Sequence, residues 1–558
     1  VTLDLNGHKI VYAGSSKQLF TVGKGIEFTI LGNGELSSTV NNLEAFVFVD
    51  GGTLNLKDGT FTNTNGIRAI TAIDGAVVNM SGGELSGVKN GSNGAGVLVK
   101  DGSQFNMTGG AITNNHCTNN GGGVFITGAE SSVNISDSAV IAGNIADGNG
   151  GGVYVANGTL NVSGGVIGSQ FMVAANADIA ANDFGKPQAG QPVDGNYANN
   201  GGGVYVEKGA LTVSGGSISG NGAFCDEAKY NNYVDKHDSK TASKDLVELN
   251  GNGGGVFVGD NVTFNINGGN ISGNTSYARP GIKIRNEYYA NIDDGGGGGY
   301  TRSNLNMTGG TISNNVAYAG GGGIYVDGPK GQDAVFTMDG GLVDGNVAIK
   351  NEGGGIYIGT VKDNKISGGV ISNNITKTEF DWGGGGIFVQ TSAKLTITNA
   401  DIKANLAEGF GGGVAGCPSG DIYLLAIQGA AIYDNVAHGE NMTQRDSADN
   451  KTDDLEAKRN PVFMHDARYQ DYFCARTSFV SGLMMADGNG ENGLNANWIG
   501  TCDYKPVTIQ NDAFAMASEM MGLTARPSAE DKAEAAERAQ VKIYGNVANT
   551  HGGGIMSN

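Results

Sequence analysis

Several residue types are scarce in this chain, and each scarcity excludes a class of protein. Cysteine occurs only 5 times, an odd number that gives no disulfide framework, although Cys474 and Cys502 share one segment and could pair. The sequence contains no CxxC motif or histidine pair of the kind that would indicate a zinc site. No apolar run reaches about eighteen residues, so no helix is expected to span a membrane.

Positive charge is scarce as well. The 55 Asp and Glu residues outnumber the 35 Lys and Arg residues, which gives a net charge of −20. A nucleic-acid partner would require a basic stripe, and an anionic membrane surface would repel such a chain. The charge fits an extracellular or cell-surface location. It leaves weak Ca²⁺ binding open, and no other cofactor is predicted.

Glycine, by contrast, accounts for 97 of 558 residues and recurs in clusters without a three-residue period. Each cluster precedes an apolar–aromatic–apolar triplet, as in Ile324-Tyr325-Val326. The triplets and their weaker copies begin at Val124, Val153, Val204, Val256, Ile324, Ile356, Ile387, Val414 and Ile555. Consecutive copies lie about 27 to 32 residues apart, a period typical of a solenoid.

A second motif, Ile/Val-x-x-Asn, runs in phase with the triplets, and a central strand such as Leu160-Asn161-Val162 falls between the two. Three short strands and three turns per period predict an all-β, right-handed parallel β-helix with inward columns of Val and Ile. We expect each motif asparagine to adopt left-handed turn geometry and to bond its neighbour one coil away. The predicted structural ladder comprises Asn144, Asn221, Asn274, Asn315, Asn346, Asn374, Asn405, Asn435 and Asn546.

Four segments interrupt the period. We expect residues 1–438 to form a β-helix with inserts at about 170–199, 224–252 and 275–294, each between the third strand and the next glycine cluster. They would then share one corner. Residues 439–540 are predicted to be a largely irregular insert with a helix near 528–540. Residues 541–558 resume a coil, which we expect to continue further because an uncapped edge strand promotes aggregation.

The inserts are richer in aromatic and basic residues than the coils. Insertions on one face of a solenoid often form its binding surface, and tyrosines are favoured anchors for sugars and proteins. The predicted binding residues are Tyr230, Tyr233, Tyr277, Arg279, Arg285, Tyr288, Tyr289, Tyr469 and Tyr472. The expected partner is a glycan or a surface protein of a host or neighbouring cell.

The pairing of GGG[VI] with [IV]xxNxA over most of residues 40–440 and 541–558 resembles the GGA[ILV] and FxxN repeats of chlamydial polymorphic membrane proteins and of adhesin-like proteins from gut microbes. This chain has Ile or Val where that family has Phe. The resemblance implies a secreted or surface-displayed bacterial adhesin or stalk.

Two alternatives stay open. The fold is similar to that of pectate lyases and polygalacturonases, whose hydrolytic members need paired carboxylates, for which Asp293 and Asp294 are the catalytic candidates. The Gly-His-Gly motif of the polygalacturonases is absent, so a non-enzymatic role is favoured. A structural fibre in which copies associate end to end is the second alternative.

Overall fold

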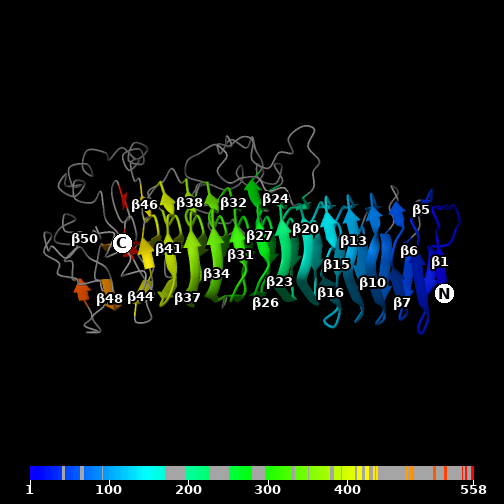
Figure 1. Ribbon diagram of the computed structural model, residues 1–558, viewed down its shortest axis with the longest axis horizontal. Coiled ribbons are helices and arrows are strands. Elements are labelled where there is room, and N and C mark those ends of the chain that lie inside the picture. Colours follow the sequence, from blue (N-terminus) through cyan, green and yellow to red (C-terminus); the bar gives the residue numbers. More distant parts are fainter. Residues whose placement is uncertain are drawn as a thin grey trace, which may run out of the picture. The chain divides into compact units, whose positions relative to one another are not determined.

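The computed structural model describes residues 1–40, 44–62, 68–90, 92–169, 195–225, 251–278, 296–327, 334–349, 351–377, 383–390, 393–408, 411–416, 421–426, 431–433 and 435–437, and short strands beyond them. These residues form strands and turns and contain no helix. The chain divides into two compact units, Val1–Asn286 with Gly297–Ser303, and Glu287–Gly296 with Asn304–Asn558. Each unit is a parallel β-solenoid, which confirms the predicted fold class (Figure 1).

Three parallel sheets run along the first unit. The triplet sheet contains β3 (Gln18–Val22), β6 (Ala45–Asp50), β9 (Arg68–Ile73), β12 (Val97–Val99), β15 (Val124–Ile126), β19 (Val153–Val155), β22 (Val204–Val206), β25 (Val256–Val258) and β29 (Gly299–Thr301). The long sheet contains β1 (Thr2–Asp4), β2 (Lys9–Tyr12), β4 (Glu27–Leu31), β5 (Glu35–Ser38), β7 (Thr53–Leu56), β8 (Thr60–Thr62), β10 (Val77–Ser86), β13 (Gln104–Thr113), β16 (Ser132–Ile135), β17 (Val140–Ala142), β20 (Thr159–Gly168), β23 (Gly209–Ser219), β26 (Val262–Ile266) and β27 (Asn270–Ser272). The short sheet contains β11 (Lys89–Asn90), β14 (His116–Cys117), β18 (Ile145–Ala146), β21 (Tyr197–Ala198), β24 (Gly222–Cys225) and β28 (Thr275–Ala278).

The second unit repeats this arrangement, with the addition of two antiparallel strand pairs, Tyr472–Cys474 with Met521–Leu523 and Ser478–Gly482 with Val507–Ile509. Its triplet sheet contains β33 (Ile324–Val326), β36 (Ile356–Ile358), β39 (Ile387–Val389), β43 (Val414–Gly416), β47 (Tyr472–Cys474), β50 (Met521–Leu523) and β53 (Ile555–Ser557). Its long sheet contains β30 (Leu305–Met307), β31 (Thr311–Ser313), β34 (Phe336–Asp344), β37 (Asp363–Ser372), β40 (Lys394–Ile397), β41 (Asp401–Lys403), β44 (Asp421–Ala426), β45 (Ala431–Tyr433), β48 (Ser478–Gly482), β49 (Val507–Ile509) and β51 (Ile543–Tyr544). Its short sheet contains β32 (Val316–Ala317), β35 (Val347–Ala348), β38 (Ile375–Thr376), β42 (Leu406–Ala407), β46 (Val436–Ala437) and β52 (Val547–Ala548).

The division of each coil into strands differs from the prediction. The predicted second and third strands lie in one sheet and merge into a single bent strand in several coils, as in β20, whose register shifts near Ser163. The third sheet is instead formed by the residues that follow the motif asparagine, such as Ile145–Ala146. Two glycines at the bend, as in Gly164-Gly165, allow the strand to change direction without ending.

Like residues stack on like along the solenoid axis. Val124 and Ile126 of β15 point inward and are fully buried, and they pair in register with Val153 and Val155 of β19. Since neighbouring strands lie about 4.8 Å apart, each inward side chain packs on its counterpart in the next coil. The core is therefore a set of aliphatic columns, as the sequence period predicts.

The glycine clusters permit the coils to approach closely at one corner. The amides of Gly122 and Gly123 donate to the carbonyls of Gly150 and Gly151 in the next coil. A Cβ atom on Gly123 would lie only 2.6 Å from the carbonyl oxygen of Gly152. Side chains are excluded there by the neighbouring backbone, which explains much of the high glycine content.

Candidate functional site

A buried asparagine ladder lies at the corner between the long and short sheets. In the first unit, the amide Nδ2 of Asn144 donates to Asn196 Oδ1 at 3.0 Å and to the carbonyl of Ile112 at 2.8 Å. The backbone amide of Asn144 donates to the same Asn196 Oδ1 at 3.0 Å, and the Oδ1 of Asn144 accepts two bonds from Asn115. Both amide hydrogens and both oxygen lone pairs are therefore used, which satisfies the side chain completely.

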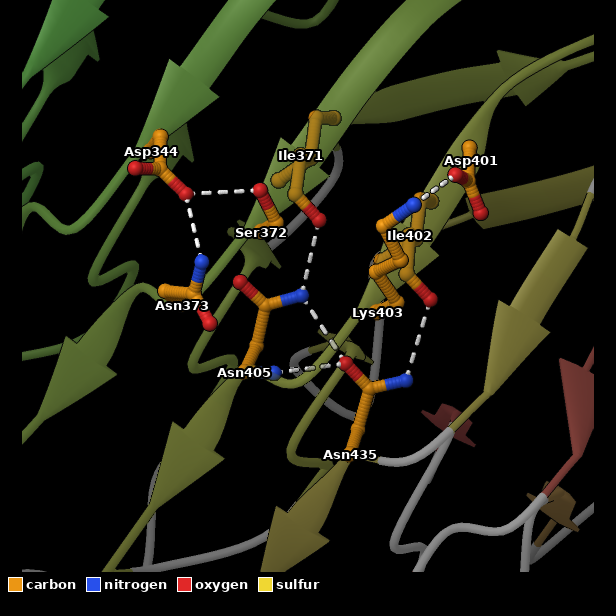
Figure 2. A network of polar contacts seen from close by, with 9 residues as sticks. All are labelled: Asp344, Ile371, Ser372, Asn373, Asp401, Ile402, Lys403, Asn405 and Asn435. Carbon is orange, nitrogen blue, oxygen red and sulfur yellow. Dashed lines mark hydrogen bonds and ion pairs between the residues drawn. The ribbon is translucent and has the colours of Figure 1, made fainter.

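The same geometry recurs in the second unit. Figure 2 shows Asn405 donating through its backbone amide and Nδ2 to Asn435 Oδ1, at 3.0 and 2.8 Å, and through Nδ2 to the carbonyl of Ile371. The ladder asparagines that the structure describes are at most 2% exposed: Asn115, Asn144, Asn196, Asn221, Asn274, Asn315, Asn346, Asn374, Asn405 and Asn435. Eight of the nine predicted ladder residues are among them, and Asn546 lies outside the described residues.

The prediction of left-handed asparagines is wrong for the ladder residues themselves. The left-handed residue is the one before the ladder asparagine in the regular coils, for example Gly143 (φ 65°), Asn314 (φ 54°) and Ala404 (φ 54°). That residue makes the tight turn from the long sheet, and the ladder asparagine follows it with ordinary backbone angles. Glycine or asparagine fills this position in most coils because both tolerate positive φ.

Two ladder residues were missing from the prediction. Asn115 follows Ile112 with the motif spacing and could have been found from it. Asn196 is separated from Ile167 by residues 168–195, so the spacing is lost. The signal that remains is the Asn-x-Ala pair Asn196-Tyr197-Ala198 before a glycine cluster.

An aromatic stack covers the outer side of the triplet sheet in the first unit. The middle residues of successive triplets are Phe125, Tyr154, Tyr205, Phe257 and Tyr300, with ring centroids 5.2, 4.9, 4.6 and 4.9 Å apart. The rings are nearly parallel, so each face is covered by its neighbour, and Tyr154 is only 6% exposed. This stack stabilises the sheet, and its ring faces are not open for stacking on a sugar.

Charged residues lie next to the stack, just after the triplets, and form a cluster of Glu207, Asp260 and Arg302 with Tyr154 and Tyr205. The hydroxyl of Tyr154 donates to Glu207 Oε2 at 2.7 Å. Arg302 Nε donates to the hydroxyl of Tyr300 at 3.3 Å, and its guanidinium lies 5.7 Å from that ring centroid. Sequence analysis missed this cluster, although Glu207 and Arg302 directly follow their triplets and Asp260 lies one position further on.

The electrostatics of the cluster favour neutral tyrosines. Burial raises the pKa of Tyr205 to about 12, with further upward contributions from the carboxylates of Glu207 and Asp260 and a downward one from Arg302. Burial and the bond to Glu207 also raise the pKa of Tyr154. Asp260 Oδ1 is buried with no hydrogen-bond partner in the part of the chain that the structure describes. The cluster therefore combines carboxylates, a guanidinium and neutral phenols at one edge of the sheet.

Most of the predicted binding residues lie outside the described residues. They are Tyr230, Tyr233, Arg279, Arg285, Tyr288, Tyr289 and Tyr469, together with the catalytic candidates Asp293 and Asp294. Only the backbone is described for Tyr277 in β28 and for Tyr472 in β47. The predicted helix at 528–540 and Cys502 also lie outside the described residues.

The expectation that the first three inserts share one corner is wrong for the first. Residues 170–194 follow β20 and precede Asn196, so they leave between the long and short sheets. Residues 226–250 and 279–295 follow β24 and β28, so they leave after the short sheet. The inserts predicted to share one binding face are therefore attached at two different corners of the coil.

Within the described ranges, no group of three or more His, Cys, Asp or Glu side chains is placed to hold a metal ion. The same residues include no helix long and apolar enough to cross a membrane. Cys117 is free and buried, and burial raises its pKa to about 12.

Comparison with known proteins gave no relative. No protein-family model, curated protein or solved structure matches the chain.

Proposed function

We propose that this chain is a segment of an extracellular, adhesin-like scaffold in which a stiff β-solenoid carries inserts that bind a glycan or a surface protein. The acidic charge and the repeat resemblance support this location and class. The proposal requires a solenoid whose coils keep their regular spacing at each point where a long insert is attached.

The continuity of the asparagine ladder carries the proposal. Residues 170–194 enter the chain between Asn144 and Asn196, yet these two asparagines bond at 3.0 Å, as adjacent rungs do elsewhere. Residues 226–250 enter between Asn221 and Asn274, which also bond at 3.0 Å. A frame that keeps its spacing across such insertions can vary its inserts without losing its fold.

Two deletions test the proposal because the coil pattern defines how to close each gap. Removing residues 169–194 joins Gly168 to Gly195 and restores the Ile-x-x-Asn spacing between Ile167 and Asn196. Removing residues 224–250 joins Ala223 to Gly251 and restores an Asn-x-Ala-x-Asn-Gly turn. This second deletion also removes Tyr230 and Tyr233.

The intact chain and both deletion variants would be screened on a glycan array and on bacterial and epithelial cells. We expect the intact chain to bind at least one glycan or cell type that the double deletion no longer binds, with circular dichroism and thermal unfolding close to those of the intact chain. If the double deletion binds every such ligand as well as the intact chain does, the assignment to these inserts is overturned. Filaments formed without any binding would favour the structural fibre.

An enzyme acting on an extracellular polysaccharide is a second candidate, favoured by the cluster of Glu207, Asp260 and Arg302. A carboxylate and an arginine beside phenolic hydroxyls are residue types that can transfer protons and hold an acidic sugar. Release of reducing ends from an acidic polysaccharide, abolished in Glu207→Gln, would support this candidate over the scaffold. Cleavage unaffected by that change would exclude the cluster as its site.

A further inference from the structure

The outer face of the long sheet in the first unit carries a second, solvent-facing asparagine ladder. β7, β10, β13, β16 and β20 lie side by side there (Figure 1). Each Nδ2 donates to the Oδ1 of the preceding coil at 2.9 to 3.0 Å. The residues of this outer ladder are Asn55, Asn79, Asn106, Asn134 and Asn161.

Hydroxyl and amide side chains flank the outer ladder in the same register. Gln104, Ser132 and Thr159 pair with one another two positions before the asparagines. Thr108, Ser136 and Ser163 lie two positions after them. Gln104, Thr108 and Ser163 are exposed, and Ser132, Ser136 and Thr159 are half-buried. Strand alternation turns all of these side chains away from the core.

The strip of this face that carries the outer ladder from Asn79 to Asn161 is uncharged, although the chain carries a net charge of −20. Glu84 of β10 lies past the bend, where it accepts a hydrogen bond from Thr113. The outward residues of β10, β13, β16 and β20 from Val77 to Ser163, taken before and at the bend, include no ionisable side chain. Charged groups lie at its margins: Asn55 donates to Glu27 beyond one end, and Ser136 donates to Asp137 in the following turn. The area between them is a neutral polar surface.

Among the residues that the structure describes, the outer ladder uses only half of its hydrogen-bonding capacity. A side-chain amide has two N–H donors and two oxygen lone pairs. Asn79, Asn106 and Asn134 each use one N–H and one lone pair within the ladder. One donor and one acceptor per coil are therefore not used within the described part of the chain, on half-buried side chains that repeat about every 4.8 Å.

We propose that this face binds a neutral linear polysaccharide laid along the solenoid axis. Sugar hydroxyls both donate and accept, which matches the free donor and acceptor on each rung. A neutral ligand matches the charge of the face, whereas an ionic ligand would lose hydration here without gaining a counter-charge. A repeating polymer can present equivalent hydroxyls to successive coils, so that weak contacts add along its length. The inserts take no part in this contact.

The test uses binding to insoluble cellulose, chitin and β-1,3-glucan, with pectate and alginate gels as acidic comparisons. The face variant is Gln104→Arg/Thr108→Arg, which changes two exposed positions and keeps the outer ladder. The matched control is Thr118→Arg/Asn119→Arg, two exposed turn residues of the same coil. Both variants add the same charge, and circular dichroism would verify that both fold.

We expect the intact chain to bind at least one neutral polymer and neither acidic one. The face variant should bind about tenfold more weakly, and the control should bind as the intact chain does. The chain lacking residues 169–194 and 224–250 should keep this binding, which separates it from the scaffold proposal. Equal binding by both arginine variants, preference for the acidic gels, or a face that instead joins two copies in sedimentation experiments would overturn the inference.

Discussion

Removing one rung of the buried ladder tests how the solenoid is held together. The change is Asn144→Ala in the first unit, at a side chain with no exposed surface. It deletes the two bonds that Nδ2 donates, to Ile112 and Asn196, and the two that Oδ1 accepts from the backbone and side chain of Asn115. The bond from the backbone amide of residue 144 to Asn196 remains possible.

The cost follows from the number of bonds and their burial. A net contribution of about 1 kcal/mol per hydrogen bond gives about 4 kcal/mol for the four. In the variant, the two N–H groups of Asn115 that bonded Asn144 Oδ1 stay buried and lose this acceptor. A buried donor without an acceptor keeps its full desolvation penalty, so the loss of stability should not be smaller than this sum. The control is Asn106→Ala in the outer ladder, which loses two bonds at a half-buried position. Water can replace those bonds, so we expect less than about 1 kcal/mol.

Native-state hydrogen exchange is the appropriate assay because a repeat array need not unfold in one step. The amide of Asn115 donates directly to the deleted Oδ1 and reports the local free energy of opening. A loss of about 4 kcal/mol corresponds to exchange about a thousandfold faster at this amide. Protection that changes less than about tenfold, or an equal effect of Asn106→Ala, would refute the view that the buried ladder holds adjacent coils together.

Three further predictions concern backbone geometry and pH. Ala404→Gly should stabilise the second unit by about 0.5 to 1 kcal/mol in denaturant unfolding, because Ala404 is exposed and left-handed, and an unchanged midpoint would contradict this. Gly123→Ala should destabilise by more than about 2 kcal/mol through collision with the Gly152 carbonyl, whereas Gly23→Ala, which meets nothing within 4 Å, should not. Burial raises the pKa of Tyr205 from 10.0 in the unfolded chain to about 12 in the folded protein. The neutral phenol therefore contributes its full stability to the fold below about pH 10, and this contribution is lost as the pH rises toward 12. Tyr205→Phe should therefore shift alkaline unfolding to higher pH, and an identical midpoint would contradict that.

The repeat period was enough to predict the fold because stacking places equivalent residues in equivalent environments. Val153 and Val155 could be assigned to the core from their phase alone, and both are fully buried. The bend within β20 was harder to predict, because a Gly-Gly pair in a sequence is as typical of a turn between two strands as of a bend within one strand. The residues after each ladder asparagine form the short sheet. Its strand is only two residues long in coils such as that of Ile145–Ala146, which is too short to show an alternating pattern of apolar and polar residues.

The candidate sites were predicted less well, for a physical reason. Sequence reasoning sought function in the inserts, where composition changes, and most of those residues lie outside the described part of the chain. Glu207, Asp260 and Arg302 sit inside regular coils, where a charged residue after a triplet resembles any solvated turn residue. The outer ladder was hidden similarly, since Asn106 and Asn134 alternate with core residues as ordinary strand positions do.

The ladder also explains why an insertion is tolerated next to it. In regular coils the chain reaches the ladder through a left-handed residue, such as Gly143 before Asn144 or Gly220 before Asn221. Before Asn196 the chain arrives from residues 170–194, and Gly195 is not left-handed. Asn196 nevertheless makes the full set of bonds, to Asn221 at 2.9 Å and to the carbonyl of Ile141 at 2.8 Å. On the side of Asn196, these bonds involve only its own side chain and backbone amide. The ladder therefore does not depend on the conformation of the turn that precedes each asparagine. This turn is the part of the coil that a long segment can replace.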